Sequence, residues 1–385
     1  MLIFSRPLPL SLYIHIPWCV RKCPYCDFNS HQAQSSLPED LYVAALLQEL
    51  DSRLPLIQNR PLKSIFFGGG TPSLFSAQAI GGILEGVAKR IAVSGNLEVT
   101  LEANPGTIDQ PRFRGFRAAG INRLSLGIQS LQDEKLRILG RIHDRASAIQ
   151  AVARAKEAGF RHFNLDIMYG LPDQSLEDAR QDIQTALDLA PTHFSWYQLT
   201  LEPNTAFYRQ PPPLPSDDAA WEMQLAGQQI LSEAGFRQYE VSAYSLPRQE
   251  CAHNRNYWEF GDYLGIGAGA HSKITDHESG IIRRFSQVRH PKDYLDARKR
   301  LNLNTSELRE PDIIFEFMLN ALRLTQGVPA DLFTRHTGLP LQRIEPLLTA
   351  ARQRELLIED TENLCPTELG KKFLNNLTEM FLTAS

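Results

Sequence analysis

The segment Cys19-Val-Arg-Lys-Cys23-Pro-Tyr-Cys26 places three cysteines within eight residues, directly after the apolar run Leu12-Tyr-Ile-His-Ile-Pro-Trp18. The apolar run predicts a buried β-strand that leads into a cysteine loop. Three thiolates from one short loop can hold three corners of a cubic iron–sulfur cluster, whereas full ligation by protein needs four. The fourth iron would be open to a ligand that is not protein, so the spacing favours a reactive site over electron storage alone.

The same cysteines could instead bind zinc or stay without a metal. A zinc site would need paired C-x2-C units and a fourth Cys or His at a second fixed spacing. His31 is the only nearby candidate, and the C-x3-C half is unusual for zinc. We therefore expect an iron–sulfur cluster on Cys19, Cys23 and Cys26, with zinc as the alternative.

The length and composition of the chain limit the classes of protein to which it can belong. With 385 residues the chain is long enough for two domains, because single cores rarely grow past about 250–300 residues. A net charge of −4 gives no general attraction to nucleic acid or to anionic membranes. No apolar run approaches the ~18 residues that span a bilayer, and the first residues lack the pattern of a signal peptide. We therefore expect a cytoplasmic protein, and a reducing compartment also suits an iron–sulfur cluster.

Predicted helices alternate with predicted strands over the first two thirds of the chain. This alternation predicts a parallel sheet with right-handed helical crossovers, and six units suit an open, partial barrel better than a closed barrel of eight. The predicted strands are Leu12–Pro17, Ser64–Phe67, Leu97–Glu102, Arg123–Gln129, His162–Met168 and Phe194–Leu201, and the predicted helices are one from Pro38, 76–92, 109–119, 131–139, 145–158, 175–189 and one after residue 215.

Polar or glycine-rich residues follow five consecutive predicted strands. Because the carboxyl ends of parallel strands open onto one common mouth, these residues should gather there. The glycines before Thr71 would let a ligand approach the backbone, although they would serve a tight turn as well. The strand-end residues could also be loop caps, and Arg141 a surface charge. The segments are the cysteine loop, Gly68-Gly-Gly70-Thr71-Pro72, Glu102-Ala-Asn-Pro105, Gly127-Ile-Gln129-Ser and Asp166-Ile-Met-Tyr-Gly170-Leu-Pro172.

The spacing C-x3-C-x2-C, with Tyr25 before the last cysteine, resembles the radical S-adenosylmethionine (radical SAM) family. The resemblance implies a [4Fe-4S] cluster whose open iron is chelated by the amino and carboxylate groups of S-adenosylmethionine, in a partial (β/α)6 barrel. Arg141 could bind the methionine carboxylate through two N–H groups, and Gln129 and Asp166 could accept from ribose hydroxyls. By this resemblance the cofactor contacts are Tyr13, Tyr25, Gly70, Thr71, Glu102, Gln129, Arg141 and Asp166.

Taken together, these motifs resemble, over residues 11–380, the branch that contains oxygen-independent coproporphyrinogen III oxidases and the HemW group of haem chaperones. Phe28 stands where the oxidases carry a further cysteine, and only 18 residues precede Cys19, fewer than in the oxidases. His253-Asn-Arg-Asn-Tyr-Trp258 matches the H-N-x-x-Y-W motif of the HemW group. The resemblance implies that His253 binds haem as cargo for apoproteins. The alternatives are a buried core histidine, a radical enzyme that decarboxylates a porphyrinogen, and a plain electron-transfer protein.

Residues 305–385 predict a separate helical module. Its order resembles a winged helix, which would suggest DNA, but it holds 12 Asp and Glu against 8 Lys and Arg, and Pro346 falls inside a predicted helix. We therefore expect a lid or packing domain and no nucleic acid. Its predicted elements are helices 311–325, 329–336 and 340–354, a hairpin across Leu356–Pro366 and a helix from Thr367; the expected domains are the barrel 1–240, an extension 241–304 with the H-N-x-x-Y-W motif, and the helical domain 305–385.

The expected partners follow from these assignments. Haem and haem-accepting apoproteins would be bound in turn, and an electron donor would serve the cluster. A membrane-associated client and a second copy of the chain, in a homodimer, complete the expected set.

Overall fold

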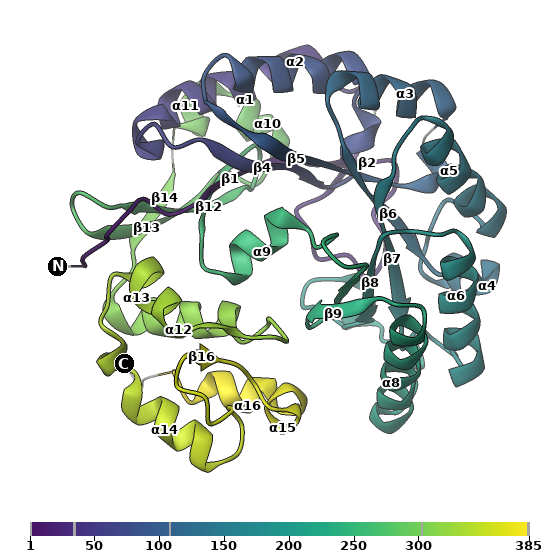
Figure 1. The fold of residues 1–385 in the computed structure, drawn as a ribbon. Helices are drawn as coiled ribbons and strands as arrows, with labels where there is room; N and C mark the ends of the chain where they lie inside the picture. The colour runs from purple at the N-terminus through teal and green to yellow at the C-terminus, as the bar shows by residue number, and fades with distance from the viewer. Residues whose placement is uncertain (1, 34–35, 108, 302, 383–385) are drawn as a thin grey trace.

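A computed structural model describes residues 2–33, 36–107, 109–301 and 303–382 and shows a curved sheet with helices around its outer side (Figure 1). Six neighbouring strands are parallel, and each is followed by a helical connection, which confirms the predicted partial barrel. The parallel strands are β1 (Leu10–Ile16), β4 (Leu62–Gly69), β5 (Val93–Ala103), β6 (Arg123–Gln129), β7 (His162–Tyr169) and β8 (His193–Gln198).

Serine and aspartate caps fix where the outer helices begin. Ser76, Asp109, Asp144 and Ser216 each accept a hydrogen bond from the backbone N–H three residues further on. Such caps satisfy amide groups that have no partner inside the helix, so the start of each helix is written locally in the sequence. The outer helices are α1 (Glu39–Arg53), α2 (Ala77–Ala88), α3 (Gln110–Ala119), α4 (Asp133–Ile138), α5 (Arg145–Glu157), α6 (Leu176–Asp188) and α8 (Asp217–Glu233).

The sheet continues past the six parallel strands on both sides. On one side a later strand, β11, lies parallel to β1, with Leu10 opposite Asp262. Residues 241–304 therefore extend the same sheet. The added strands are β9 (Arg237–Glu240), β10 (Ala243–Ser245), β11 (Asp262–Ile266), β12 (His271–Asp276), β13 (Ile281–Ser286) and β14 (Asn304–Glu307), and the order across the sheet is β14-β13-β12-β11-β1-β4-β5-β6-β7-β8-β10-β9.

Different elements cover the two faces of the barrel sheet. On the outer face Leu12, Ile14 and Leu126 are buried in the main apolar core beneath the helices. The inner side is occupied by a short helix, α9 (Ala252–Trp258), which lies within the ring of strands (Figure 1). Strands covered on both sides are buried along their whole length, as β6 is. Two further short helices, α10 (Pro291–Leu295) and α11 (Ala297–Arg300), connect β13 to β14.

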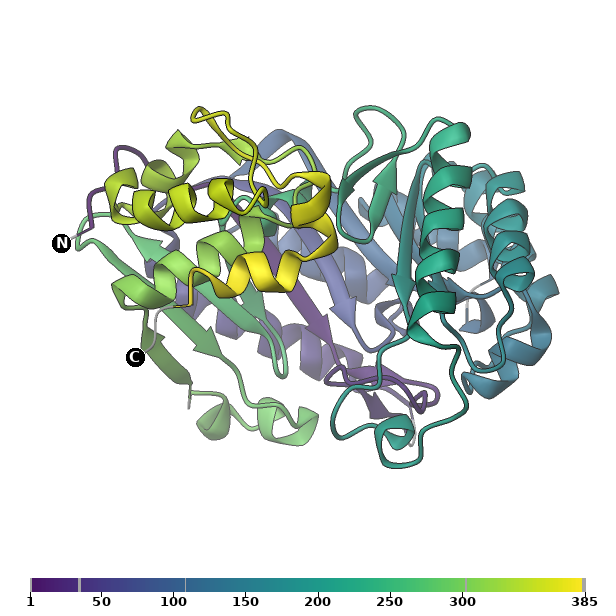
Figure 2. The ribbon, with the colours of Figure 1, turned by 90° about the horizontal axis from the view of Figure 1, so that it is seen from below.

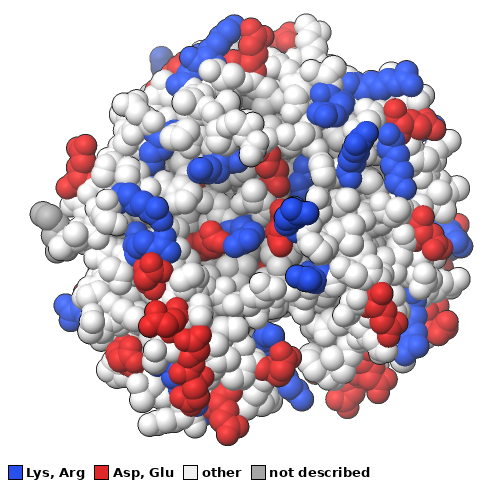
Figure 3. All heavy atoms as spheres, in the orientation of Figure 1, with Lys and Arg blue, Asp and Glu red and all other residues white. Residues whose placement is uncertain are grey.

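The C-terminal helical domain spans the gap between the two edges of the sheet. Leu308 N donates to Ile282 O of β13 at 2.9 Å, and Thr325 N donates to Tyr239 O of β9 at 3.1 Å. The domain has its own apolar core around Phe317, and acidic side chains gather over it at the lower left of Figure 3. Its elements are α12 (Glu310–Ala321), β15 (Val328–Pro329), α13 (Asp331–Thr337), α14 (Glu345–Gln353), β16 (Asn363–Leu364), α15 (Glu368–Lys372) and α16 (Leu374–Glu379).

One local prediction for this domain needs correction. Pro346 does not interrupt a helix over 340–354: residues Leu341–Arg343 form a 3-10 turn, and Pro346 lies in the first turn of α14. Proline is tolerated there because its missing N–H would have no partner inside the helix. In the part of the chain that the structure describes, no helix is both long and apolar enough to cross a bilayer.

Candidate functional site

The cysteine loop connects two short paired strands, β2 (Trp18–Cys19) and β3 (His31–Gln32), at the carboxyl end of β1. Figure 2 shows this dark purple loop at the opposite side of the molecule from the C-terminal helices. All three thiols are partly exposed. Polar groups lie beside each sulfur: Thr71 Oγ1 donates to Cys19 Sγ at 3.5 Å, Arg141 donates to Cys23 Sγ at 3.8 Å, and Ser30 Oγ lies 3.9 Å from Cys26 Sγ.

The donor set of this loop fits an iron–sulfur cluster. Burial raises the pKa of Cys19 and Cys26, so both thiols keep their protons until a metal displaces them. Hydroxyl and guanidinium donors toward sulfur are the contacts that tune such a cluster once it is bound. Among the described residues, no three Cys, His, Asp or Glu side chains surround a single ion position. A cubic cluster does not require that arrangement, because each cysteine binds a different iron.

The glycine turn after β4 packs against the cysteine loop. Gly70 N donates to Ile16 O at 2.8 Å, and Thr71 N donates to Trp18 O at 2.8 Å. A Cβ on Gly70 would lie 2.6 Å from Trp18 O, and Gly69 has a φ of +118°, which side chains rarely adopt. The turn therefore needs its glycines for protein contacts, whatever ligand also lies beside it.

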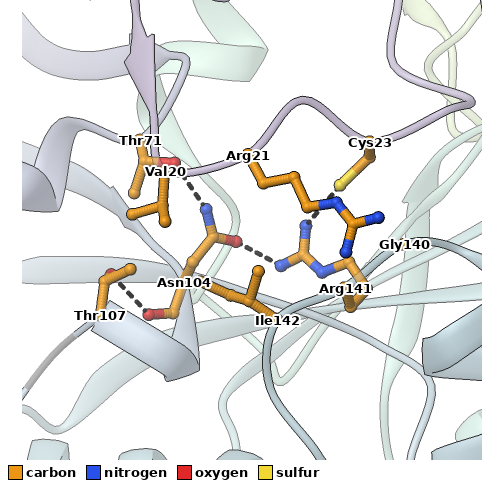
Figure 4. A pocket seen from close by; sticks show the side chains of 9 residues that line it. All are labelled: Val20, Arg21, Cys23, Thr71, Asn104, Thr107, Gly140, Arg141 and Ile142. Atoms are coloured by element: carbon orange, nitrogen blue, oxygen red, sulfur yellow. Dashed lines mark hydrogen bonds between the residues drawn. The ribbon is translucent and has the colours of Figure 1, made fainter. Parts of the chain in front are cut away.

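Arg141 connects the cysteine loop to the strand ends (Figure 4). Its NH2 group donates to Gly127 O at 2.7 Å and to Asn104 Oδ1, while Asn104 Nδ2 donates to Thr71 Oγ1 at 2.8 Å. Arg141, Asn104, Thr71 and Cys23 line one pocket. The Nε of Arg141 is buried and has no partner among the described residues. An unpaired guanidinium N–H beside an exposed thiol is suited to an incoming carboxylate.

Two carboxyl groups lie together deeper in the mouth. Glu102 Oε2 accepts from Gly69 N at 3.1 Å, and burial together with the charge of Asp166 raises the pKa of Glu102 to about 8. Asp166 accepts from Ser125 Oγ at 3.1 Å and from Asn164 Nδ2 at 2.8 Å, yet burial still raises its pKa. Two carboxyl groups with raised pKa values favour a cationic or hydroxyl-bearing ligand, which would relieve their desolvation.

Gln129 has the least relaxed backbone of the predicted site residues. Its φ is +68°, and the pairing of β6 with β7 shifts by one residue at this point. Tyr197 OH donates to Gln129 Oε1 at 2.5 Å and fixes the side chain. A left-handed backbone at a residue other than glycine costs about 1 kcal/mol or more, and such positions cluster at functional sites.

The two predicted tyrosines occupy different surroundings. Tyr13 OH lies 3.0 Å from His15 Nδ1, and burial raises its pKa. Tyr25 packs against the apolar side chains of Leu139 and Leu171, and burial raises its pKa as well. The structure thus brings Thr71 and Arg141 into contact with the cysteines, whereas the ring of Tyr13 lies deeper, 6.4 Å from that of His253. Gly70 directly follows β4, and Glu102, Gln129 and Asp166 lie in β5, β6 and β7.

His253 lies elsewhere, inside the barrel on α9. Its side chain is almost fully buried, at 1% exposed, and burial lowers its pKa to about 3. Its Nδ1 lies 2.9 Å from Ser64 Oγ, and its Nε2 lies 3.1 Å from Tyr257 OH. Both ring nitrogens are therefore engaged, which is the geometry of the buried core histidine that was the alternative for this motif.

Sequence reasoning missed two residues of the mouth, Asn104 and Tyr197. Asn104 joins Arg141 to Thr71, and Tyr197 holds Gln129. Asn104 lies within the Glu102-Ala-Asn-Pro105 segment, so its place at a strand end was the available signal. Tyr197 lies within β8 and carries no local signal that separates it from other strand tyrosines.

Comparisons with known proteins agree with this geometry. The family described as the radical SAM superfamily matches residues 13–186, and the one described as the HemN C-terminal domain matches residues 308–373. The chain is 51% identical to the "Heme chaperone HemW" of Haemophilus influenzae, over 97% of this chain and 98% of that protein. It is 49% identical to the protein of the same name from Escherichia coli, over 97% and 98%.

A solved structure and a more distant relative widen the comparison. Coproporphyrinogen III oxidase (HemN) from Escherichia coli, a radical SAM enzyme, superposes with a TM-score of 0.82 and 24% identity, covering 98% of this chain and 91% of that one. That identity supports a shared fold and nothing finer. A mouse mitochondrial radical S-adenosyl methionine domain-containing protein 1 is 37% identical over 88% of this chain and 77% of its own. The chain belongs to the radical SAM superfamily and, within it, to the family of the heme chaperone HemW.

Proposed function

We propose that this protein is a haem chaperone: it binds haem and passes it to apoproteins, and it does not decarboxylate coproporphyrinogen. The observation that carries the proposal is the 51% identity, over nearly the whole chain, with a relative named for that function. Phe28 supports it as well. Where the oxidases of this branch have a further cysteine, Phe28 leaves the loop with three thiols, and its side chain is 59% exposed.

For the cofactors we assign each role to residues of the mouth. Cys19, Cys23 and Cys26 would hold a [4Fe-4S] cluster, which when bound supplies a one-electron centre with an open iron. Tyr13, Tyr25, Gly70, Thr71, Glu102, Gln129, Arg141 and Asp166 would bind S-adenosylmethionine. Arg141 orients a carboxylate through its free Nε.

The burial and hydrogen bonds of His253 favour a structural role over the haem-binding role that its motif implies. As an axial ligand it would have to leave one of its two partners, Ser64 or Tyr257, and its ring is only 1% exposed. We infer that His253 instead holds α9 against β4 inside the barrel. The haem ligand would then be another histidine, one with a ring nitrogen that is not hydrogen-bonded.

The cellular setting is part of the same proposal. We place the protein in the cytoplasm, with an electron donor for the cluster and haem-accepting apoproteins as partners. A membrane-associated client and a homodimer belong to the same proposal. The size-exclusion mass of the reconstituted protein, with and without haem, tests the homodimer.

The second candidate function is an oxygen-independent coproporphyrinogen III oxidase, which the shared fold with HemN favours. One anaerobic experiment separates the two. Reconstituted protein is loaded with haem and mixed with apomyoglobin, and in parallel it is incubated with coproporphyrinogen III, S-adenosylmethionine and a reductant. Transfer of haem to apomyoglobin without a decarboxylated product supports the chaperone, whereas turnover to protoporphyrinogen would replace it by the oxidase.

A further inference from the structure

His271 differs from His253 in its exposure and in the hydrogen bonding of its ring nitrogens. It is exposed, at the start of β12, and neither of its ring nitrogens has a hydrogen-bond partner among the described residues. Burial and the charges of Arg284 and Arg289 lower its pKa, so the ring is neutral near pH 7. A neutral imidazole with a free nitrogen is the commonest protein ligand for haem iron.

The register of the sheet extension sets what lies beside His271. The antiparallel pairing places His271 opposite Ser286 and Lys273 opposite Arg284. Alternate residues of a strand share a face, and opposite residues point to the same side. His271, Lys273 and Arg284 therefore share one face, and Arg284 is close enough to lower the pKa of His271.

This face leads to a cavity at the junction of α9, the sheet extension and α12. The cavity is about 210 Å³ and is lined by Tyr257, Trp258, Tyr263, Lys273, Arg284 and Asn320, among others. Tyr257 and Trp258 are the last two residues of the H-N-x-x-Y-W motif. The rings of Tyr257 and Tyr263 lie 4.5 Å apart at 79°, so they form an aromatic corner.

The cavity is also lined by a cationic side chain that can bind an anionic group. Arg284 donates to Tyr263 OH and to Glu316 of α12, which uses two of its five N–H donors. Lys273 is already paired, at 2.9 Å, with Asp262. Arg284 is also paired, with Glu316, but it keeps three further N–H donors that can bind a carboxylate.

We propose that haem binds on this inner face, with His271 as the axial ligand, the tyrosine corner against the macrocycle and a propionate at Arg284. The site deepens the proposed chaperone function and rests on it. Lys273 is two residues from His271, roughly 7 Å along the strand, so one flat macrocycle ligated at His271 reaches the cavity walls. An exposed ligand also leaves haem open to transfer, which a buried ligand such as His253 would not.

The test is a titration of reconstituted protein with ferric haem, followed by the Soret band and by low-temperature electron paramagnetic resonance of the ferric iron. We expect His271→Ala to lose the imidazole-ligated spectrum and to bind haem at least tenfold more weakly. His162→Ala, which removes an exposed histidine at the start of β7, is the matched control and should match wild type. Added imidazole should restore the spectrum to His271→Gly.

The outcomes separate this site from the proposed function. If wild type takes up no haem, the chaperone function and the site both fall. If wild type binds haem and His271→Ala keeps the imidazole-ligated spectrum, only the assignment of His271 falls. A second measurement compares haem with its dimethyl ester: wild type should prefer the diacid, and Arg284→Gln should lose that preference, while an unchanged preference would remove Arg284 from the site.

Discussion

The mouth of the barrel and its interior around α9 both hold buried polar side chains, but Arg141 at the mouth and the histidines of the interior differ in how far their polar atoms are satisfied. At the mouth, the Nε of Arg141 has no partner among the described residues, and the side-chain contacts of the thiols are long, at 3.5, 3.8 and 3.9 Å. In the interior, His253 and His193 have both ring nitrogens paired. Because an unpaired buried donor costs free energy, it persists where a ligand completes it, whereas a paired one stabilises the fold by itself.

The largest effect should come from the cysteine loop. Cys23→Ala removes one of three thiolates, so we expect the reconstituted protein to fall from about four irons per chain to nearly none. Cys251→Ala removes a fully buried thiol directly before α9, away from the cysteine loop, so this variant should keep its iron. Iron analysis and the visible spectrum measure both. Full cluster content in Cys23→Ala would show that the mouth is not the cluster site.

A substitution in the barrel interior should lower the free energy of unfolding. His253→Ala leaves Ser64 and Tyr257 without their partner and opens a cavity in the barrel, so we expect a loss of about 3 kcal/mol in the free energy of unfolding. Urea denaturation followed by circular dichroism measures the change. Ser64→Ala, which removes one of the two contacts, should cost about 1 kcal/mol. A His253→Ala protein as stable as wild type would contradict the structural role of this residue.

Arg141→Ala tests cofactor binding at the mouth, and its expected effect is smaller. It removes a charge-assisted contact to the proposed carboxylate, so we expect S-adenosylmethionine to bind more weakly by about 2 kcal/mol, with the cluster intact. Arg145→Ala, an exposed arginine on α5, is the matched control. Equilibrium dialysis with the reconstituted protein gives both affinities. Equal affinities in the two variants would take Arg141 out of the cofactor site.

The smallest expected effect is a dependence on pH. The pKa of His253 is lowered to about 3 in the folded protein, so the unfolded chain binds the proton first as pH falls below about 6.5. Stability from this residue is therefore present above pH 6.5 and decreases as pH falls, by about 1 kcal/mol between pH 6.5 and 5.5. His253→Gln should lack this contribution to the pH dependence of the free energy of unfolding. Denaturation of both proteins at a series of pH values measures the difference. An identical slope in both proteins would mean that His253 is not buried as a neutral ring.

Much of the mouth could be predicted because its signals are local. The C-x3-C-x2-C spacing and the strand-end residues Glu102 and Asp166 are each set by a few neighbouring residues. Asn104 was missed although it lies in a quoted segment, because only its contact with Arg141 distinguishes it from an ordinary loop residue.

The sequence by itself determined the six strand–helix units, the cysteine loop and the set of residues at the strand ends, since periodicity, capping and spacing are short-range properties. Only the tertiary structure decided that β11 pairs with β1, that α9 fills the barrel and that the C-terminal domain spans the sheet edges. These contacts join residues that are distant along the chain, such as Leu10 with Asp262 and Tyr239 with Thr325, and such pairings leave no local pattern. For the same reason the sequence alone could not show that His253 is buried and that His271 is exposed. Burial depends on what packs against a residue.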